Sequence, residues 1–346
     1  MMEVRFKIVY LKKRFPLRIS RGVRDGQYNL YVEVEDDGFV GLGETSPGIS
    51  EGAATAEEAQ LQLEKFVQQS FNPDAIYNVY DQALAENIAP CALAALDMAL
   101  WDLKAKKAGL PLYQLLGIAK PKVATSITLG IMTPEEAKER LPIILEQDGI
   151  RTLKVKLGNP EGIEADKAMY TEVLYYNKAY PISIRVDANG GWSPKDAKHM
   201  MQWLAERHCE YVEQPLQEGL ESELPYLYKN RPLPIFLDES CRFASSIPKW
   251  AHTVDGVNMK LMKCGGITGA LRIIHTAYAF GLKTMIGCMG ESSVSIAAGA
   301  AVSGMLDHID LDSHLNLNPD PCSGAPLVNQ IIMPLSLPGH GGQFKS

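Results

Sequence analysis

The sequence predicts an α/β protein built on a (β/α)8-type TIM barrel, of the (β/α)7β kind, preceded by an α+β capping domain. Two observations favour this fold. From Val123 onward, short β-rich runs alternate with amphipathic stretches, which is typical of βαβ units. In addition, an acidic residue follows three successive apolar runs at an interval of roughly 25 residues, about one strand, one helix and two loops of such a barrel. These residues are Asp187, Glu213 and Asp238.

The length and composition are compatible with this fold and exclude several classes of protein. A chain of 346 residues is long enough for one barrel and a smaller second domain. Its net charge of −7 argues against nucleic acid or an anionic membrane as main partner, and no apolar stretch is long enough to span a bilayer. The six cysteines form no Cys-x-x-Cys pair and are expected to be reduced, which predicts a cytoplasmic protein. The sequence is compatible with a monomer or a homo-oligomer.

Residues 1–120 are expected to form the capping domain, with three antiparallel strands and two helices. Short Gly and Asp runs interrupt the strand-like alternation and are expected to form turns. The second helix stacks leucines at helical spacing and ends at Gly109, with Pro111 beyond. The expected strands cover residues 3–10, 28–35 and 39–44, and the expected helices cover residues 54–69 and 89–107.

Residues 121–318 are expected to form the barrel, because eight strand-like runs fit a compact parallel barrel of this length. The tail, residues 319–346, is rich in Pro and Gly and is expected to pack back on the capping domain. The predicted barrel strands cover residues 123–129, 152–157, 183–187, 211–213, 235–238, 256–260, 283–287 and 308–311.

The three recurring acids are candidate ligands of one metal ion. A carboxylate at the carboxyl end of each of three successive parallel strands points into the same barrel mouth. A single Asp after a strand is usually a helix N-cap, but matched positions in three successive units favour ligands. Hard oxygen ligands, with no Cys or His beside them, favour Mg²⁺ over zinc. The sequence therefore predicts one Mg²⁺ site formed by Asp187, Glu213 and Asp238.

A Lys-x-Lys sequence lies in the strand before the three acids. Lys154 and Lys156 point the same way along a strand, into the mouth if Val155 packs outward. Two inward lysines are costly without a purpose, because barrel interiors are packed. The like charge of Lys154 favours the neutral form of Lys156, which would make Lys156 a usable base.

A third lysine follows the strand four units later. Lys260 is therefore expected to face Lys156 across the mouth, and two bases opposed across one carbon indicate an epimerase or racemase. Lys263 is interpreted as a loop or structural cation. Gly265-Gly266 is interpreted either as a plain turn or as a close approach of the backbone to substrate.

Over essentially its whole length the chain resembles the enolase superfamily, in the subgroup that includes muconate cycloisomerase. The mandelate-racemase branch carries a His near the end of barrel strand seven, where this chain reads Ile-Gly-Cys-Met-Gly-Glu at 286–291. The matching motifs are Ala-Ala-Leu-Asp-Met-Ala-Leu-Trp-Asp-Leu at 94–103, Gln-Leu-Leu-Gly at 114–117, Asp-Ala-Asn-Gly-Gly-Trp at 187–192, Glu-Gln-Pro at 213–215, Asp-Glu-Ser at 238–240 and Lys-Leu-Met-Lys-Cys-Gly-Gly at 260–266.

Within this subgroup, Asp310-Leu311-Asp312 resembles the motif with which dipeptide epimerases hold the substrate's α-ammonium group. Two carboxylates that face one way would form a pocket for a cation, whereas the alternative is a turn cap and a surface ion pair. The resemblance implies a Mg²⁺-dependent dipeptide epimerase that moves the α-proton of the C-terminal residue through an enediolate. It implies that Lys156 and Lys260 are the catalytic bases and that Lys154 stabilises the enediolate.

Further residues are expected to position ligands and substrate. Asn189 and Glu239 are candidates to orient the metal ligands and the lysines. At the end of the first strand, Ser126 and Thr128 are expected near the peptide backbone, and Met289 is counted among the substrate-binding residues.

The side-chain specificity is predicted from a mobile loop at residues 17–28, which the resemblance implies closes over the site. It carries Arg18, Arg21 and Arg24, all of which could equally lie in solvent. If Arg24 binds an acidic side chain, the substrate is L-Ala-D/L-Glu. Related epimerases accept hydrophobic or cationic dipeptides, so these remain alternatives.

Three rival functions stay open. Within the superfamily, an o-succinylbenzoate synthase or a muconate-type cycloisomerase would have no ammonium group to bind at Asp310 and Asp312. A class-I aldolase would form a Schiff base on a single lysine, and would keep its activity in EDTA. A non-catalytic binder on the same scaffold is not favoured, because the lysines and all three acids are present.

Overall fold

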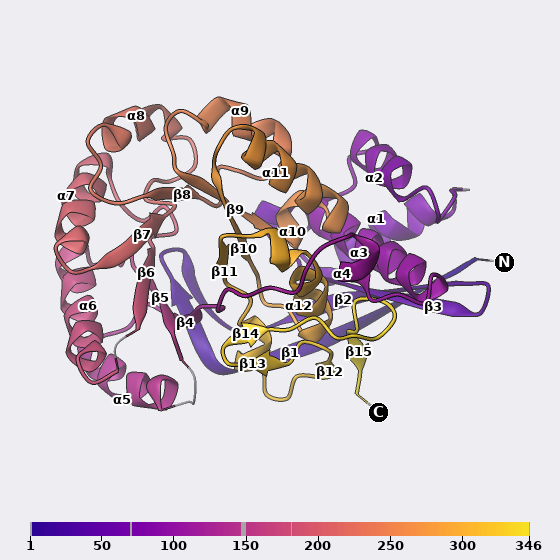
Figure 1. The fold of residues 1–346 in the computed structure, drawn as a ribbon, viewed down its shortest axis with the longest axis horizontal. Coiled ribbons are helices and arrows are strands. Elements are labelled where there is room, and N and C mark those ends of the chain that lie inside the picture. The colour runs from indigo at the N-terminus through magenta and orange to yellow at the C-terminus, as the bar shows by residue number, and fades with distance from the viewer. Residues whose placement is uncertain (1, 70, 147–149, 181, 346) are drawn as a thin grey trace.

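The computed structural model describes residues 2–69, 71–146, 150–180 and 182–345. Its first part is a three-stranded antiparallel sheet covered by helices, on one side of the molecule in Figure 1. The short helix α2 was not predicted, whereas the other two long helices lie where the sequence indicated. The elements are β1 (Glu3–Ile19), β2 (Gly22–Asp36), β3 (Phe39–Thr45), α1 (Ala56–Val67), α2 (Ile76–Ala85), α3 (Pro90–Lys107) and α4 (Leu112–Leu115).

The second part is an eight-stranded parallel sheet in the order β11-β10-β9-β8-β7-β6-β5-β4, with helices on its outer face (Figure 1). A parallel bridge between Thr125 and Ile309 joins the two edges. The predicted barrel and capping-domain fold is therefore confirmed. The strands are β4 (Ile127–Leu129), β5 (Thr152–Lys156), β6 (Ser183–Asp187), β7 (Cys209–Glu213), β8 (Ile235–Leu237), β9 (Gly256–Lys260), β10 (Lys283–Gly287) and β11 (His308–Ile309).

Helices connect these strands in the right order for a parallel barrel. Two of them begin with a Ser or Thr side chain that accepts a hydrogen bond from the first turn, followed by Pro, which is a strong start signal. The helices are α5 (Pro134–Leu145), α6 (Ile163–Asn177), α7 (Pro194–Ala205), α8 (Leu224–Tyr228), α9 (Ile247–Trp250), α10 (Leu261–Cys264), α11 (Ile267–Ala279) and α12 (Ser293–Val302).

Helix α3 lies between the capping domain and the barrel, and it is buried on nearly every side. Asp97 on this helix accepts a hydrogen bond from the backbone N of Thr268 at 2.9 Å, and burial raises the pKa of Asp97 to about 7. At Gly265 and Gly266 the backbone has positive φ, and an added Cβ would meet α3 side chains. Gly265-Gly266 is thus a turn that lets the barrel pack against α3, not an approach to substrate.

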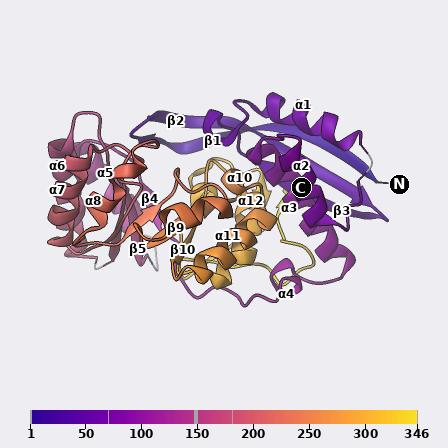
Figure 2. The same ribbon diagram turned by 90° about the horizontal axis from the view of Figure 1, so that it is seen from above.

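The β1–β2 hairpin is much longer than the sequence predicted. Residues 17–28 were expected to be a loop, but Leu17 pairs with Arg24 and Tyr10 with Tyr28, and the turn lies at residues 20–21. The alternation was obscured because charged residues occupy the outward face and Pro16 interrupts it. Figures 1 and 2 show the hairpin reaching from the capping domain over the barrel. There, Ile131 N donates to Arg18 O at 2.8 Å.

The tail contacts the capping domain. Its strands pair with one another as β12 (Cys322–Ser323) with β15 (Gln343–Phe344), and β13 (Leu327–Val328) with β14 (Ile331–Ile332). Close to its end, the His340 backbone N donates to Asp102 of α3 at 2.8 Å.

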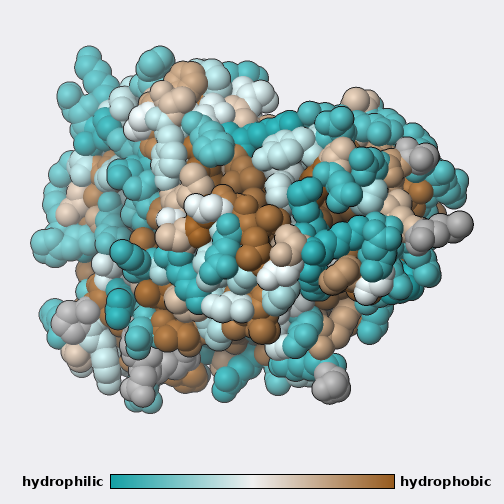
Figure 3. All heavy atoms as spheres, turned by 45° about the vertical axis from the view of Figure 1, so that its right-hand side comes forward, coloured by the Kyte–Doolittle hydropathy of each residue, from teal (hydrophilic) through white to brown (hydrophobic). Residues whose placement is uncertain are grey.

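The surface is mostly hydrophilic at its periphery, and hydrophobic side chains gather towards the middle of the face in Figure 3. No helix among the described residues has the length and apolar character needed to cross a membrane.

Candidate active site

The three acids that the sequence singled out meet at the carboxyl ends of adjacent strands. Asp187 and Glu213 are the last residues of β6 and β7 and are register partners, and Asp238 follows β8 directly. One carboxylate oxygen from each lies within 4.8 Å of the others, and all three residues are buried. Three hard oxygen donors at this spacing fit a single divalent cation such as Mg²⁺.

The Lys-x-Lys pair of β5 points into the same mouth. The Lys154 ammonium lies 2.8 Å from Glu213, 2.7 Å from Asp310 and 3.1 Å from Asp187, and the Lys156 ammonium lies 2.6 Å from Asp187. Both lysines are buried. The structure therefore places carboxylates, and not only the Lys154 charge, beside Lys156. These ion pairs compensate the cost of burying so many charges.

Burial and these ion pairs shift the pKa values in opposite directions. Burial disfavours the charged form of Asp187, but Lys156 and Lys154 outweigh it and hold the pKa of Asp187 below its usual value. Burial and the neighbouring Asp187 charge raise the pKa of Glu213 to about 8. Burial disfavours the Lys154 ammonium, yet the surrounding carboxylates raise its pKa well above the usual value. A cation bound by Asp187 and Glu213 would favour their charged forms.

Lys260 is the last residue of β9. Around the barrel, three strands separate β9 from β5 in each direction, so Lys260 lies across the mouth from Lys156. Its ammonium is 2.7 Å from Asp238. Burial opposes this charge, but Asp238 raises the pKa of Lys260 above its usual value. The predicted opposition of two lysines is thus compatible with the strand order.

Two further residues support the acids, of which the sequence singled out only Lys263, as a loop or structural cation. The Asn258 side chain, two residues before Lys260 on the same face of β9, donates to Glu213 at 2.7 Å. Lys263, interpreted as a loop or structural cation, lies in α10, is buried and contacts the Asp238 carboxylate. Burial opposes the charge of Asp238, but Lys260 and Lys263 hold its pKa well below the usual value. The sequence signal that could have identified both residues is their closeness to Lys260, which places their side chains beside the same three acids.

Asp310 and Asp312 lie at the opposite end of the cavity from Asp238. One Asp310 oxygen pairs with Lys154, and the other has no hydrogen-bond partner within the described part of the chain. Asp312 accepts a hydrogen bond from the backbone N of Thr128 at 2.7 Å. Burial and the Asp310 charge raise the pKa of Asp312 to about 6. These two carboxylates therefore form an under-neutralised pair, which is a suitable site for a substrate cation.

The cavity above these residues has two lobes. The metal-side lobe, of about 220 Å³, reaches Asp238 and lies under the β1–β2 hairpin. The ammonium-side lobe, of about 110 Å³, reaches Asp310 and Asp312. Residues that line both lobes form their junction, namely Lys13, Leu17, Lys156, Lys260, Cys288 and Met289.

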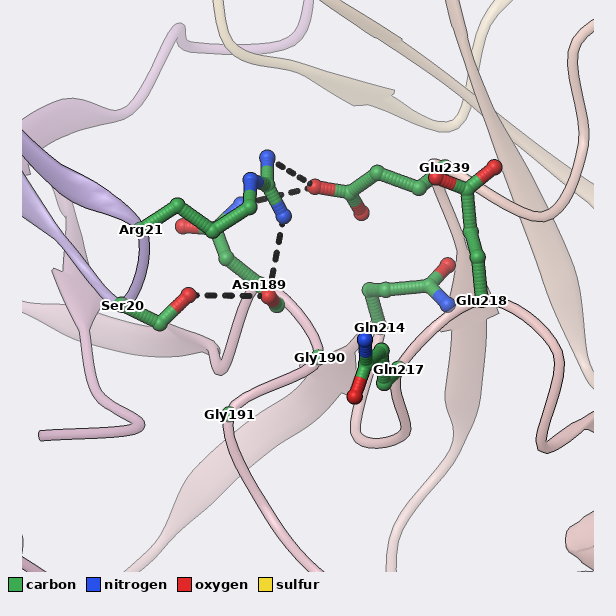
Figure 4. A pocket seen from close by; sticks show the side chains of 9 residues that line it. All are labelled: Ser20, Arg21, Asn189, Gly190, Gly191, Gln214, Gln217, Glu218 and Glu239. Carbon is green, nitrogen blue, oxygen red and sulfur yellow. Dashed lines mark hydrogen bonds and ion pairs between the residues drawn. The ribbon is translucent and has the colours of Figure 1, made fainter. Parts of the chain in front are cut away.

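The hairpin tip is held to the barrel by Arg21, for which the sequence predicted no partner. Arg21 lies 2.6 Å from Glu239 and donates to the backbone O of Asn189 at 3.0 Å, and Ser20 donates to the same oxygen (Figure 4). Asn189 in turn donates to Asp187. Asn189 and Glu239 thus connect the candidate metal-binding acids with the hairpin, beside a pocket of about 400 Å³.

The remaining predicted residues divide between the cavity and its surroundings. Arg24 and Met289 line the metal-side lobe, and Thr128 lines the ammonium-side lobe. Arg24 is exposed, and its one hydrogen bond among the described residues goes to Gln27 at 3.4 Å. Ser126 is buried and accepts a hydrogen bond from Arg185, so it faces the barrel interior and not the expected peptide backbone.

Comparison with known families matches both parts of the chain. Residues 1–117 match the mandelate racemase / muconate lactonizing enzyme N-terminal domain, and residues 135–345 match the enolase C-terminal domain-like family. The chain belongs to the enolase superfamily. The predicted resemblance is confirmed, and the three acids that could hold a metal ion lie at the carboxyl ends of adjacent barrel strands.

Individual relatives within this superfamily act on dipeptides. The chain is 59% identical over 99% of both chains to a hydrophobic dipeptide epimerase from a Flavobacteria bacterium. It is 32% identical to the L-Ala-D/L-Glu epimerase of Bacteroides thetaiotaomicron, over 98% of this chain and 87% of the relative. A crystal structure of the Enterococcus faecalis V583 dipeptide epimerase with Mg and L-Leu-L-Tyr is 35% identical over 98% of both chains, with a TM-score of 0.88.

Proposed function

We propose that the protein is a Mg²⁺-dependent dipeptide epimerase, which transfers a proton at the α-carbon of the C-terminal residue. The observation that carries this proposal is a single cavity with a possible base on either side. Lys156 and Lys260 end opposite strands, the three acids lie between them, and Asp310 and Asp312 stand at the far end. A dipeptide has the matching groups, a carboxylate at one end and an ammonium group at the other.

The residues of the chain then take distinct roles. Mg²⁺ bound by Asp187, Glu213 and Asp238 would supply positive charge next to the substrate carboxylate. One of the two opposed lysines removes the α-proton, and the other returns a proton to the opposite face. The Lys154 ammonium stabilises the charge that develops on the carboxylate oxygens as the enediolate forms.

We further propose that the C-terminal residue of the preferred dipeptide is hydrophobic. Leu17, Ile19, Val23 and Met289 line the metal-side lobe, which gives a side chain there an apolar environment. The relative at 59% identity, named a hydrophobic dipeptide epimerase, supports this specificity. The acidic alternative depends on Arg24, which lines the same lobe and has no carboxylate within 4.0 Å among the described residues. L-Ala-D/L-Glu is therefore the second candidate.

Proton–deuterium exchange tests the reaction and its specificity together. We expect the Mg²⁺-loaded protein in D₂O to place deuterium at the C-terminal α-carbon of L-Ala-L-Leu and to produce both epimers, observed by NMR. L-Ala-L-Glu should react more slowly if the lobe is apolar, and faster if Arg24 binds the acidic side chain. No exchange with any dipeptide of a panel would contradict the proposal and favour a cycloisomerase or o-succinylbenzoate synthase.

An Asp312→Ala variant separates the epimerase from these alternatives. Removing one partner of a buried charge pair costs about 2–5 kcal/mol, so we expect kcat/KM for dipeptides to fall about 30- to 4000-fold. The measurement is the initial rate of exchange across a range of dipeptide concentrations. Asp307→Ala, at the other end of β11, is the control, because Asp307 pairs with Lys283 outside the cavity. A cycloisomerase would tolerate Asp312→Ala.

The domain limits at 1–120, 121–318 and 319–346 stay a prediction. We also propose that the protein acts in the cytoplasm, which is supported by six free cysteines, five of them buried. The proposed reaction is compatible with a monomer or a homo-oligomer.

A further inference from the structure

Lys13 is a buried cation in β1 that neither the catalytic proposal nor the metal site uses. Its neighbours Lys12 and Arg14 are exposed, whereas Lys13 itself is 8% exposed. Side chains alternate along a strand, so Lys13 occupies an inward position, as Leu11 does. A lysine at such a position is rarely buried without a purpose.

The backbone around Lys13 is fixed to the barrel. The β1–β2 register shifts between Lys12 and Leu17, and irregularities of this kind re-aim side chains next to active sites. Here Lys12 O accepts a hydrogen bond from Asn318 N at 2.9 Å. Phe15 and Asn316 exchange two further hydrogen bonds, of 3.0 and 2.8 Å. The position of Lys13 is therefore set by the barrel and not by the hairpin tip.

The Lys13 ammonium has no ion pair or hydrogen bond with any residue that the structure describes. Burial lowers its pKa, and the nearby Cys288 and Asp312 oppose this shift only in part. Although the residue is largely buried, the Lys13 nitrogen is not among the fully buried polar atoms that lack a partner, and the side chain lines the cavity. A ligand in this cavity that supplies an acceptor would therefore find a donor that is not already engaged by the protein.

Lys13 lines both lobes of the cavity, and so lies at their junction. A dipeptide with its ammonium group at Asp310 and Asp312, and its reacting α-carbon between Lys156 and Lys260, would place its peptide group at that junction. The acceptor of a peptide group is its carbonyl oxygen.

We infer that Lys13 donates a hydrogen bond to the carbonyl oxygen of the substrate's peptide bond, and thereby recognises the substrate as a dipeptide. This inference rests on the proposed function. Lys13 is then a substrate-binding residue that holds the α-carbon in place between the two bases. It is not itself an acid or base in the reaction.

A Lys13→Met variant tests the inference, with Lys12→Met as the matched control on the exposed face. Because Met keeps the apolar stem and removes a charge that has no ion pair in the protein, we expect the variant to fold with an unchanged or higher melting temperature. We expect kcat/KM for L-Ala-L-Leu to fall about 10- to 100-fold, as for the loss of a hydrogen bond to a charged donor. Lys12→Met should leave it unchanged, and Lys13→Arg should restore part of the loss.

A thioamide analogue of L-Ala-L-Leu identifies the atom that Lys13 contacts, because sulfur is a weaker acceptor than oxygen. The analogue should lower kcat/KM in the wild type and cause a much smaller further loss in Lys13→Met. An equal thioamide effect in both proteins would overturn the inference, as would a Lys13→Met variant with wild-type kcat/KM. Inactivity of the wild type with every dipeptide would overturn the proposed function as well, so the two failures are distinguishable.

Discussion

Lys156→Ala and Lys260→Ala should each abolish net epimerisation, with a loss of at least about 10²- to 10⁴-fold, the contribution typical of a positioned acid or base. Each variant should nevertheless exchange the α-proton of one epimer in D₂O, because the surviving lysine can still remove and return a proton on its own face. The epimer that exchanges should differ between the two variants. The measurement is NMR exchange with each pure epimer, for both variants.

Lys283→Ala provides the control for this experiment. Its side chain is exposed at the start of β10, where it pairs with Asp307 away from the cavity, so its loss should leave both activities unchanged. If Lys156→Ala and Lys260→Ala lost exchange with the same epimer, the two lysines could not be opposed bases. A single lysine that forms a Schiff base would instead be trapped by borohydride with a keto substrate.

Removing the divalent cation should have an effect of similar size. We expect EDTA to abolish exchange and added Mg²⁺ to restore it, whereas Glu213→Gln should not be restored by Mg²⁺. Glu213 is the ligand to choose because it lies between the other two strands and is contacted by Lys154 and Asn258. In a metal-independent aldolase, EDTA would leave the activity unchanged.

Thermal unfolding gives a second measure of Mg²⁺ binding at this site, and this measure does not depend on enzymatic activity. A ligand at 100 times its Kd stabilises the folded state by about 2.7 kcal/mol, so Mg²⁺ should raise the melting temperature of the wild type. Glu213→Gln should show little of this shift. The control is Glu206→Gln at an exposed position after α7, which should respond to Mg²⁺ as the wild type does. An equal shift in Glu213→Gln would exclude Glu213 as a ligand.

The acids and lysines could be predicted because each lies at or near the carboxyl end of a strand, at regular spacing along the chain. In a parallel barrel the carboxyl ends of all strands meet at one mouth, so Asp187, Glu213 and Asp238 had to converge once the strands were recognised. The same logic put Lys156 and Lys260 four strands apart. The position of a residue along the chain was sufficient here, because in a regular strand that position fixes the face to which the side chain points.

Residues whose position depends on contacts between the two parts of the molecule could not be predicted in this way. The sequence predicted no partner for Arg21, but the hairpin tip places it against Glu239, more than 200 residues away in the chain. Lys13 lay among five basic residues of an N-terminal segment with nothing to distinguish it. Its burial follows from an irregular stretch of β1 that is held by Asn316 and Asn318.

Local sequence patterns were sufficient to predict the barrel, its capping domain and the set of acids and lysines at the mouth. These follow from local periodicity and from the fixed geometry of parallel strands. Three features became visible only in the folded chain: the hairpin lies over the cavity, Lys263 and Asn258 contact the acids, and Lys13 is buried at the junction of the two lobes. These features depend on burial and charge pairing between segments far apart in the sequence, and no local pattern indicates which of those residues will meet.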